Sequence, residues 1–233
     1  MRQNKYQYEL SVILPVHNEE GEIERVIDDI SRVLKKNKIK YEIICVENGS
    51  TDNSPKLLKN LSIQNPNLKI LQSKKGWGNA IIRAIPKARG HYFCYMVSDG
   101  QVNPNIINIM FKAIKKNKLS LVKIRRVTRE NMTRLINSRI YNFLTRLLFN
   151  LDTIDINGTP KLIETRLIRE VNLKSENIAI DLELLLKLKS RNLKWMEFPV
   201  KLIKRESGIS TTNLKAVWEM ISYMRKFYFN KQY

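Results

Sequence analysis

Asp99, in the stretch SDGQVNP, is the only acidic residue between Asp52 and Glu130. The chain around it is basic, with 42 lysines and arginines against 22 aspartates and glutamates. A carboxylate in such surroundings can bind a cation or the hydrogen-bond donors of a ligand. It can also be an ordinary turn residue, because Ser-Asp-Gly is favourable turn chemistry. The position of Asp99 relative to the predicted strands bears on this choice.

Acidic and amide side chains follow the first, second and fourth predicted strands. They are Asn18 and Glu19, then Glu47, Asn48 and Asp52, and finally Asp99 and Gln101. In an open parallel sheet, ligands bind beyond the carboxyl ends of the strands. We therefore expect these three groups at one ligand-binding edge. For Glu20 and Asp52, a surface acid and a helix N-cap are simpler roles.

Apolar patterning predicts strands that alternate with helices. Short runs rich in β-branched residues predict strands at 10–15, 41–47, 68–72, 91–97 and 119–124. Apolar residues at helical spacing predict helices at 21–36 and from about residues 54, 76 and 104. This alternation predicts an α/β fold, with a mainly parallel sheet and helices on both faces.

The pattern changes beyond Val127. It predicts a basic amphipathic helical stretch at 125–149, a turn at 155–163, a helix at 181–191, a strand at 194–200 and a final amphipathic helix from Leu214. One face of the first stretch is apolar and comprises Ile136, Ile140, Phe143, Leu144, Leu147 and Leu148. This pattern is typical of an interfacial helix on anionic lipid, and equally of a helix packed on the sheet. The final helix has the same two interpretations.

Composition limits the class of protein. A length of 233 residues with 43% hydrophobic residues suits one larger α/β domain or one domain with an appendage. The formal net charge of +20 indicates an anionic partner: nucleic acid, a membrane surface or a phosphorylated ligand. Cys45 and Cys94 lie in apolar runs, which suggests reduced core residues of a cytoplasmic protein. Without a membrane-spanning apolar run or a signal peptide, we expect a soluble or peripheral protein.

Six segments carry a family resemblance. They are, in order, SVILPVHNEE, VENGSTDNS, KKGWGNAIIRAIPKARG, SDGQVNP, DINGTPKLI, and DLELLLKLKSRNLKWMEFPV followed by RESGIS. Together they resemble the family 2 glycosyltransferases with a GT-A (Rossmann-like) fold, and among these the dolichyl- or polyprenyl-phosphate sugar synthases of the dolichol-phosphate mannosyltransferase type. The resemblance implies a GT-A domain at 1–212, with a nucleotide-sugar half at about 10–127 and an acceptor half at about 128–212. A C-terminal amphipathic helix would follow at 213–233.

The resemblance implies a nucleotide-sugar donor. The matching positions are Pro15, Asn18, Glu19, Glu47, Gly76, Gly78, Asp99 and Gln101. Glu47 stands where the family usually has an aspartate, and a carboxylate there would accept a base N–H or a ribose hydroxyl. The two glycines match the start of a helix at which the backbone can approach the nucleotide closely.

The resemblance also implies a divalent cation, Mn²⁺ or Mg²⁺. Asp99 matches the second acid of the family's DxD metal motif, and Gln101 matches the residue that supports it. Such a cation takes oxygen ligands and neutralises the charge that builds up on a departing diphosphate. Val97 departs from the family pattern, because it stands where the first aspartate of the motif is expected.

Two acceptor chemistries are compatible with the sequence. A sugar hydroxyl would need a general base, for which Asp181 and Glu183 are the candidates. A lipid phosphate is already ionised and needs no base. Asp181 also fits the first turn of a helix, where an acid is favourable.

Basic residues are predicted to bind the phosphates. Arg205 and Ser210 match the family's R-x-x-G-x-S segment, which closes over the phosphates, and a planar arginine suits phosphate oxygens. We expect Arg126 and Arg134 to join them at the acceptor or phosphate. The predicted catalytic residues are Asp99, Asp181 and Arg205.

The sequence therefore predicts an enzyme that transfers a sugar from a UDP- or GDP-linked donor to a polyprenyl phosphate by inverting direct displacement. We expect it to be cytoplasmic and peripheral on the cytoplasmic face of an anionic membrane; a homo-oligomer or a membrane-protein partner is left open. One alternative acceptor is a saccharide hydroxyl in surface-polysaccharide or glycolipid assembly. A further alternative is a non-catalytic basic module that binds nucleic acid, which does not explain the three acidic strand ends.

Overall fold

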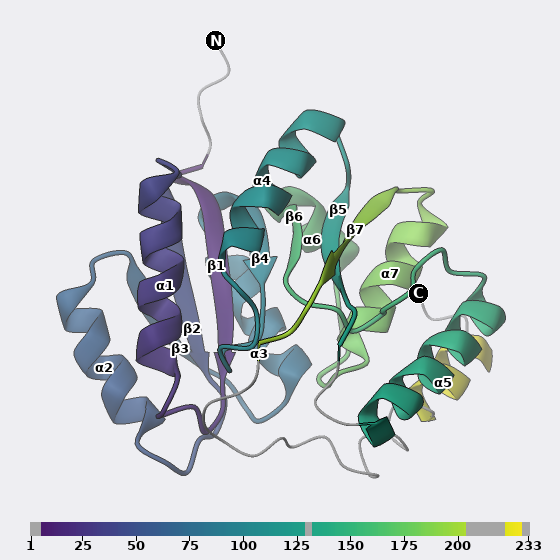
Figure 1. Ribbon diagram of the computed structural model, residues 1–233, viewed down its shortest axis with the longest axis horizontal. Coiled ribbons are helices and arrows are strands. Elements are labelled where there is room, and N and C mark those ends of the chain that lie inside the picture. The colour runs from purple at the N-terminus through teal and green to yellow at the C-terminus, as the bar shows by residue number, and fades with distance from the viewer. Residues whose placement is uncertain (1–5, 129–131, 204–221, 230–233) are drawn as a thin grey trace.

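The computed structural model describes residues 6–128, 132–203 and 222–229. In this part of the chain the strands form one seven-stranded sheet in the order β3-β2-β1-β4-β6-β5-β7 (Figure 1). The strands are β1 (Tyr8–Val16), β2 (Tyr41–Glu47), β3 (Leu68–Gln72), β4 (Gly90–Tyr95), β5 (Leu121–Arg126), β6 (Lys161–Glu164) and β7 (Trp195–Val200). The helices are α1 (Ile23–Lys36), α2 (Ser54–Gln64), α3 (Trp77–Ala84), α4 (Asn105–Asn117), α5 (Met132–Phe149), α6 (Thr165–Val171), α7 (Ile180–Ser190) and a helix at 222–229.

Two layers of helices cover the sheet, as the sequence predicts for an α/β fold. Helices α1, α2 and α4 pack on one face through aliphatic side chains such as Ile27, Leu58 and Met110. Helices α3, α6 and α7 pack on the other face, together with the inner side of α5. Apolar residues at helical spacing give each helix one face that is removed from water, and this burial drives the layering.

The first four strands run parallel and end at a common edge. Val16 at the end of β1 pairs with Glu47 at the end of β2, and Glu47 pairs with Gln72 of β3. β4 lies on the other side of β1, with Tyr95 opposite Ile13. The predicted convergence of three strand ends is therefore confirmed.

Strand β6 corrects the predicted turn at 155–163. It is inserted between β4 and β5, antiparallel to both, and α6 follows it without a linker. A strand of four residues is too short to give a periodic signal, so its cross-strand pairs define it. β6 also joins the two halves of the chain into one sheet. β4, in turn, ends at Tyr95, so Val97 lies beyond the strand rather than within it.

The helix at 222–229 belongs to the core of the described structure. Met224 and Phe227 are buried among the side chains of α5, where the Thr145 hydroxyl lies 3.2 Å from the Met224 sulfur. Tyr228 makes an edge-on ring contact with Phe149 of α5. The segment 204–221, which includes Leu214 at the predicted start of this helix, lies outside the described residues.

We predict that Phe227→Ala lowers the free energy of unfolding by about 3 kcal/mol, because it opens a cavity at a side chain with only 5% exposure. Phe229, two residues further along the same helix, is 73% exposed and provides the matched control. Its replacement by alanine should change stability by less than about 0.5 kcal/mol. Urea denaturation of the two variants measures both quantities. Equal stabilities would show that this helix does not contribute to the core.

Candidate active site

The loops that follow β1 and β2 are fastened to each other by side chain to backbone hydrogen bonds. The Asn18 side chain accepts a bond of 2.8 Å from the Thr51 amide, and the Asn18 amide donates to the Ser50 hydroxyl at 3.1 Å. The Glu19 amide donates to the Ser54 hydroxyl at 2.9 Å. Asn18 has a positive φ of 56°, a conformation that asparagine tolerates better than most residues. The predicted donor residues of the first loop are thus fixed by the second.

Glu20 and Asp52 reinforce the same junction. Glu20 is the exposed surface acid that was predicted, whereas the N-cap of α2 is Asn53 and not Asp52. The Glu20 carboxylate accepts the Asn53 amide at 2.8 Å, and Asp52 accepts the amides of Glu20 and Ser54. Burial alone would raise the pKa of Asp52, but its hydrogen bonds to Ser54 and Glu20 lower it below its ordinary value. Both acids are structural ties between loops.

Pro15 and Glu47 lie at the sheet edge where they were predicted. The buried Pro15 offers its carbonyl to the Ser98 hydroxyl at 2.7 Å, which holds the loop after β4 against β1. Glu47 is half-buried and accepts the Ser50 amide at 2.6 Å. Glu47 is the last residue of β2, so it lies where the parallel strands end.

Asn48 has a structural role that its sequence position did not reveal. Its side-chain oxygen accepts the Gly76 amide at 2.8 Å, and its side-chain nitrogen donates to the Gly76 carbonyl at 3.2 Å. This two-way bond fixes the start of α3 against the end of β2. A buried asparagine, at 6% exposure, can satisfy both backbone groups at once.

The two glycines predicted to admit a nucleotide have a different neighbour in the structure. A Cβ on Gly78 would lie 1.9 Å from the Ser175 carbonyl oxygen, and one on Gly76 would lie 2.4 Å from that of Glu176. Gly76 also has a φ of 142°, which disfavours residues with a side chain. The close approach that requires glycine is therefore made by the protein's own loop at 175–177.

Asp99 and Gln101 form a tight turn beyond β4. Asp99 is 8% exposed, and its carboxylate accepts the Gln101 amide at 3.1 Å. The Gln101 carbonyl accepts a hydrogen bond of 2.8 Å from the Ile203 amide. This bond connects the segment that follows β7 to the Asp99 turn. Within the described residues there is no group of three or more metal-ligating side chains.

Arg126 is held in a bidentate ion pair at the end of β5. Its Nε and Nη2 atoms each lie 2.8 Å from a different carboxylate oxygen of Asp155, whose Oδ2 also accepts the Arg126 amide at 2.9 Å. Burial alone would lower the pKa of Arg126, but Asp155, together with the charges of Asp181 and Asp99, raises it. Arg126 is therefore a fixed positive charge that interacts with both acids. Asp155 lies in the segment predicted only as a turn, and no role was foreseen for it.

A row of polar side chains crosses the sheet beneath this site. Register pairs Tyr95 of β4 with Lys161 of β6, Lys161 with Lys123 of β5, and Lys123 with Glu197 of β7. Both lysines are fully buried. Lys123 contacts Glu197 at 2.9 Å and the backbone carbonyl of Asp155, whereas Lys161 donates to Asp181.

The position of Asp181 argues against the catalytic role predicted for it. Its carboxylate is 1% exposed and accepts hydrogen bonds from Lys161, from the Tyr95 hydroxyl at 2.8 Å and from the Trp77 indole at 3.2 Å. These three donors occupy both carboxylate oxygens, and the burial of the side chain keeps it away from solvent. Burial lowers the pKa of the Lys161 ammonium to about 8, although Asp181 opposes that shift. Asp181 thus compensates a buried lysine.

Glu183, the other candidate base, is also occupied. Its carboxylate accepts hydrogen bonds from the backbone amides of Lys174 and Ser175. It also forms an ion pair with Lys187 at 2.7 Å. Burial alone would raise the pKa of Glu183, but the hydrogen bonds from Lys187 and Ser175 lower it. Neither acid at the start of α7 offers a free oxygen to an acceptor hydroxyl.

Comparison with known proteins identifies the family. A family model described as Glycosyl transferase family 2 matches residues 11–171. This chain is a member of glycosyl transferase family 2. Its GT-A fold is shared with glucosyl-3-phosphoglycerate synthase of Mycobacterium tuberculosis, solved with Mn²⁺, UDP-glucose and phosphoglyceric acid. That structure superimposes with a TM-score of 0.73 and 18% identity over 96% of this chain and 79% of the other.

Curated relatives include two lipid-phosphate enzymes. Dolichyl-phosphate beta-glucosyltransferase of Dictyostelium discoideum is 34% identical over 126 residues, which is 48% of this chain and 38% of the relative. Dolichol-phosphate mannosyltransferase of Pyrococcus furiosus is 34% identical over 107 residues, which is 46% of this chain and 30% of the relative. The matched region thus spans only 30–38% of the length of these relatives. Membership of the family favours a glycosyltransferase over the nucleic-acid-binding alternative.

Three predicted residues of this family 2 glycosyltransferase lie outside the described structure. Arg205 and Ser210 fall in 204–221. Arg134 belongs to the backbone of α5, but its side chain is not among the described residues. Of the basic residues predicted at the acceptor or phosphates, Arg126 is the one whose surroundings the structure describes.

Helix α5 presents its apolar face outward, which removes one of the two predicted interpretations. Its inner side carries Tyr141, Asn142, Thr145 and Phe149, all buried. The large apolar side chains point away from the sheet and are exposed by 50% at Ile136, 53% at Ile140, 61% at Phe143, 37% at Leu144, 70% at Leu147 and 43% at Leu148. The prediction that this face packs on the sheet is wrong, because the sheet-side surface is filled by the other residues.

We predict that Gly78→Ala lowers the free energy of unfolding by about 1–3 kcal/mol without any nucleotide present, since the added methyl group overpacks against the backbone at Ser175. Asn79→Ala, one position further along α3, is the control and should cost much less. Denaturant unfolding of both variants provides the measurement. A Gly78→Ala protein of normal stability that fails to bind a nucleotide-sugar would instead support the role first predicted for this glycine.

Proposed function

We propose that this family 2 glycosyltransferase transfers a sugar from a UDP- or GDP-linked donor to a polyprenyl phosphate, by direct displacement with inversion. The observation that carries the proposal is the occupied state of both candidate bases, Asp181 and Glu183. A saccharide hydroxyl would have to lose its proton to a base, whereas a phosphate arrives ionised. The two curated relatives that carry dolichyl or dolichol phosphate in their names support the same acceptor class.

The donor is proposed to bind at the edge where β1, β2 and β4 end. Pro15, Asn18, Glu19 and Glu47 line this edge, and Asp99 with Gln101 closes it beside β4. The shared fold of a synthase solved with UDP-glucose and Mn²⁺ is consistent with this arrangement. Carboxylate oxygen at the edge can accept ribose hydroxyls or base N–H groups.

Asp99 and Gln101 fit a divalent cation that a substrate helps to bind. Mg²⁺ and similar ions are commonly held by one or two carboxylates, with water and substrate phosphates completing the shell. One carboxylate and one side-chain amide in a turn match that donor set. When bound, Mn²⁺ or Mg²⁺ would neutralise charge on the departing diphosphate.

Arg126 is proposed to orient the acceptor phosphate. Its guanidinium is fixed by Asp155, and its side chain is 25% exposed at the end of β5, so a phosphate oxygen can reach it there. A phosphate oxygen of the acceptor then forms a bond to the anomeric carbon while the bond from that carbon to the diphosphate breaks. Attack opposite the leaving group inverts the configuration, and no proton is transferred.

We predict that Asp99→Asn abolishes the Mn²⁺-dependent thermal stabilisation by a nucleotide-sugar, because it removes the charged ligand of the cation. In the unmodified protein a donor at a hundred times its Kd stabilises the native state by about 2.7 kcal/mol, which corresponds to a Tm increase of about 5–10 °C. A thermal-shift panel of UDP- and GDP-sugars, with and without Mn²⁺, provides the measurement. Asp28→Asn, an exposed acid on α1, is the control. A full Mn²⁺-dependent shift in the Asp99 variant would exclude the metal role.

The exposed face of α5 is proposed to rest on an anionic membrane surface, at the cytoplasmic side. α5 begins shortly after β5, whose carboxyl end lies at the same edge of the sheet as the proposed donor site (Figure 1). The exposed Arg139 and Arg146 accompany the apolar residues, and the chain carries a net charge of +20. None of the described helices is long and apolar enough to cross a bilayer. Peripheral attachment through α5 would bring the acceptor's phosphate to the edge of the sheet.

We predict that the protein sediments with vesicles that contain anionic lipid and is released by salt, which screens its attraction to the headgroups. The double variant Phe143→Ser, Leu147→Ser should bind about tenfold more weakly, because two exposed apolar side chains no longer insert. Ile63→Ser on α2 alters a side chain that is 78% exposed outside this face, and should bind normally. Equal losses in both variants would mean that α5 is not the contact surface.

A further inference from the structure

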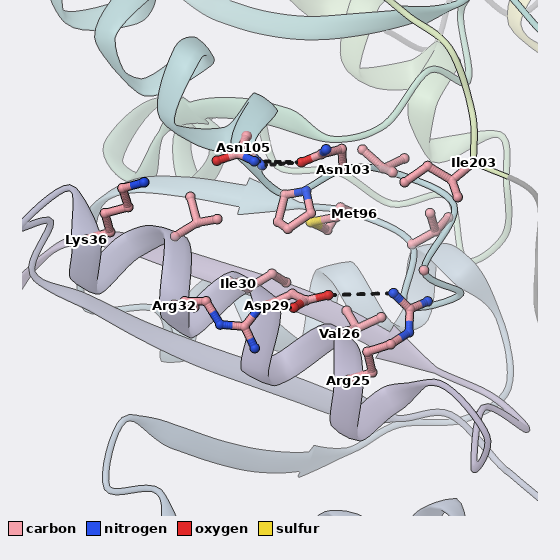
Figure 2. Close-up of a pocket in the computed structure, with 15 residues that line it drawn as sticks. Arg25, Val26, Asp29, Ile30, Arg32, Lys36, Met96, Asn103, Asn105 and Ile203 are labelled. Atoms are coloured by element: carbon pink, nitrogen blue, oxygen red, sulfur yellow. Dashed lines mark hydrogen bonds and ion pairs between the residues drawn. The ribbon is translucent and has the colours of Figure 1, made fainter.

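A cavity of about 350 Å³ lies between α1 and the loop at 96–105 that leads from β4 to the start of α4 (Figure 2). Its walls are largely apolar and include Val26, Ile30, Val33, Met96, Val97 and Ile203. None of the residues assigned above to the donor, the cation or the acceptor lines it. The volume falls in the range of about 300–1,000 Å³ that is usual for small-molecule sites.

Positive charge lies along the rim of this cavity. Arg25, Asp29, Arg32 and Lys36 form one row along α1, as Figure 2 shows. Asp29 is shared between Arg32 at 2.7 Å and Arg25 at 3.5 Å. Lys36 has no hydrogen bond or ion pair within the described part of the chain. Arg25 is also paired with the buried Glu22, so the positive charge that no acid compensates lies at the Lys36 end.

We propose that this cavity binds a small amphiphilic anion, namely a carboxylate or phosphate carried on a short hydrocarbon. The charged head lies at Lys36 and Arg32, where charge is least compensated, and the hydrocarbon runs along Ile30 towards Met96 and Val97. With an inorganic anion bound, the apolar walls of the cavity would stay in contact with water. With a neutral hydrocarbon bound, the basic side chains at the rim would have no anionic partner. A molecule with an anionic head and a hydrocarbon chain interacts favourably with both the basic rim and the apolar walls.

Val97 connects the cavity with the departure from the family's motif. The family resemblance implies an acid at position 97. In this chain Val97 packs on the face of the sheet that α1 and α4 cover, and it lines the cavity. Gly100 lines it as well, and a Cβ there would lie 2.2 Å from the Arg25 guanidinium. An occupant would therefore touch the Asp99 loop on both sides of Asp99.

Titration calorimetry with three probes tests the proposal: octyl phosphate below its micelle-forming concentration, octanol and inorganic phosphate. We expect octyl phosphate to bind, and the other two to bind at least about tenfold more weakly, which corresponds to about 1.4 kcal/mol. Lys36→Gln should weaken the binding of octyl phosphate about threefold, because the variant loses one exposed ion pair between the lysine and the phosphate. Lys35→Gln removes the same charge from the neighbouring exposed position, outside the cavity, and should have no effect.

Asn105→Trp supplies a steric test, because Asn105 is exposed at the mouth of the cavity and a tryptophan there would fill it. We expect octyl phosphate binding to be lost in this variant with the fold intact by circular dichroism. The proposal is overturned if octyl phosphate does not bind the unmodified protein, if it still binds the Asn105 variant, or if the two lysine variants behave alike.

The α5 face is the competing site for an alkyl chain, so the variant Phe143→Ser, Leu147→Ser is titrated in parallel. Octyl phosphate should bind it with unchanged affinity, since neither residue lines the cavity. Loss of binding in this variant would show that octyl phosphate binds to α5 and not in the cavity, which would overturn the proposal. These measurements need no donor and no transfer reaction, so their result is independent of the proposed function.

Discussion

Two fully buried lysines constrain the structure around β5 and β6 more than any other feature. Lys123 and Lys161 face each other across β5 and β6, where two like charges would be strongly unfavourable without compensation. Glu197 and Asp181 supply it, and Asp155 offers both its carbonyl to Lys123 and its carboxylate to Arg126. Asp181, which the sequence offers as a general base, thereby serves to hold the sheet, and Asp155 holds Arg126 in place. The preference for an acceptor that is already charged follows from these roles.

Much of the fold could be predicted from sequence because its first half is built from strong local patterns. The β1 and β2 strands and helix α1 have clear apolar periods, and the polar residues after each strand indicated the edge at which they meet. β6 could not be foreseen, since its four residues include a buried lysine whose acidic partner, Asp181, lies 20 residues further along the chain. The same long-range pairing concealed the role of Asp155. Residues whose partners lie far along the chain leave no local signal.

The candidate site was predictable in location but not in the reasons for its residues. Asn18 and Asp99 lie where the strand ends indicated. Gly76 and Gly78, in contrast, are explained by the protein's own loop at 175–177, and Asn48 is a buried tie rather than an exposed ligand group. The sequence shows that a glycine or an asparagine stands at each of these positions. Only the packing around them shows which contact requires that residue. The outward apolar face of α5 shows the same limit, because periodicity alone cannot tell which side of a helix faces the core.

The loop at 174–177 joins the donor edge to α7 through a continuous set of hydrogen bonds. Asn48 binds Gly76, the Asn79 amide binds the Glu176 carbonyl, and the Ser175 amide binds Glu183. These contacts make the end of β2, the start of α3 and the start of α7 one cooperative unit, whose parts open together. A change at any one of these hydrogen bonds would therefore affect all three elements, although they lie far apart in the sequence.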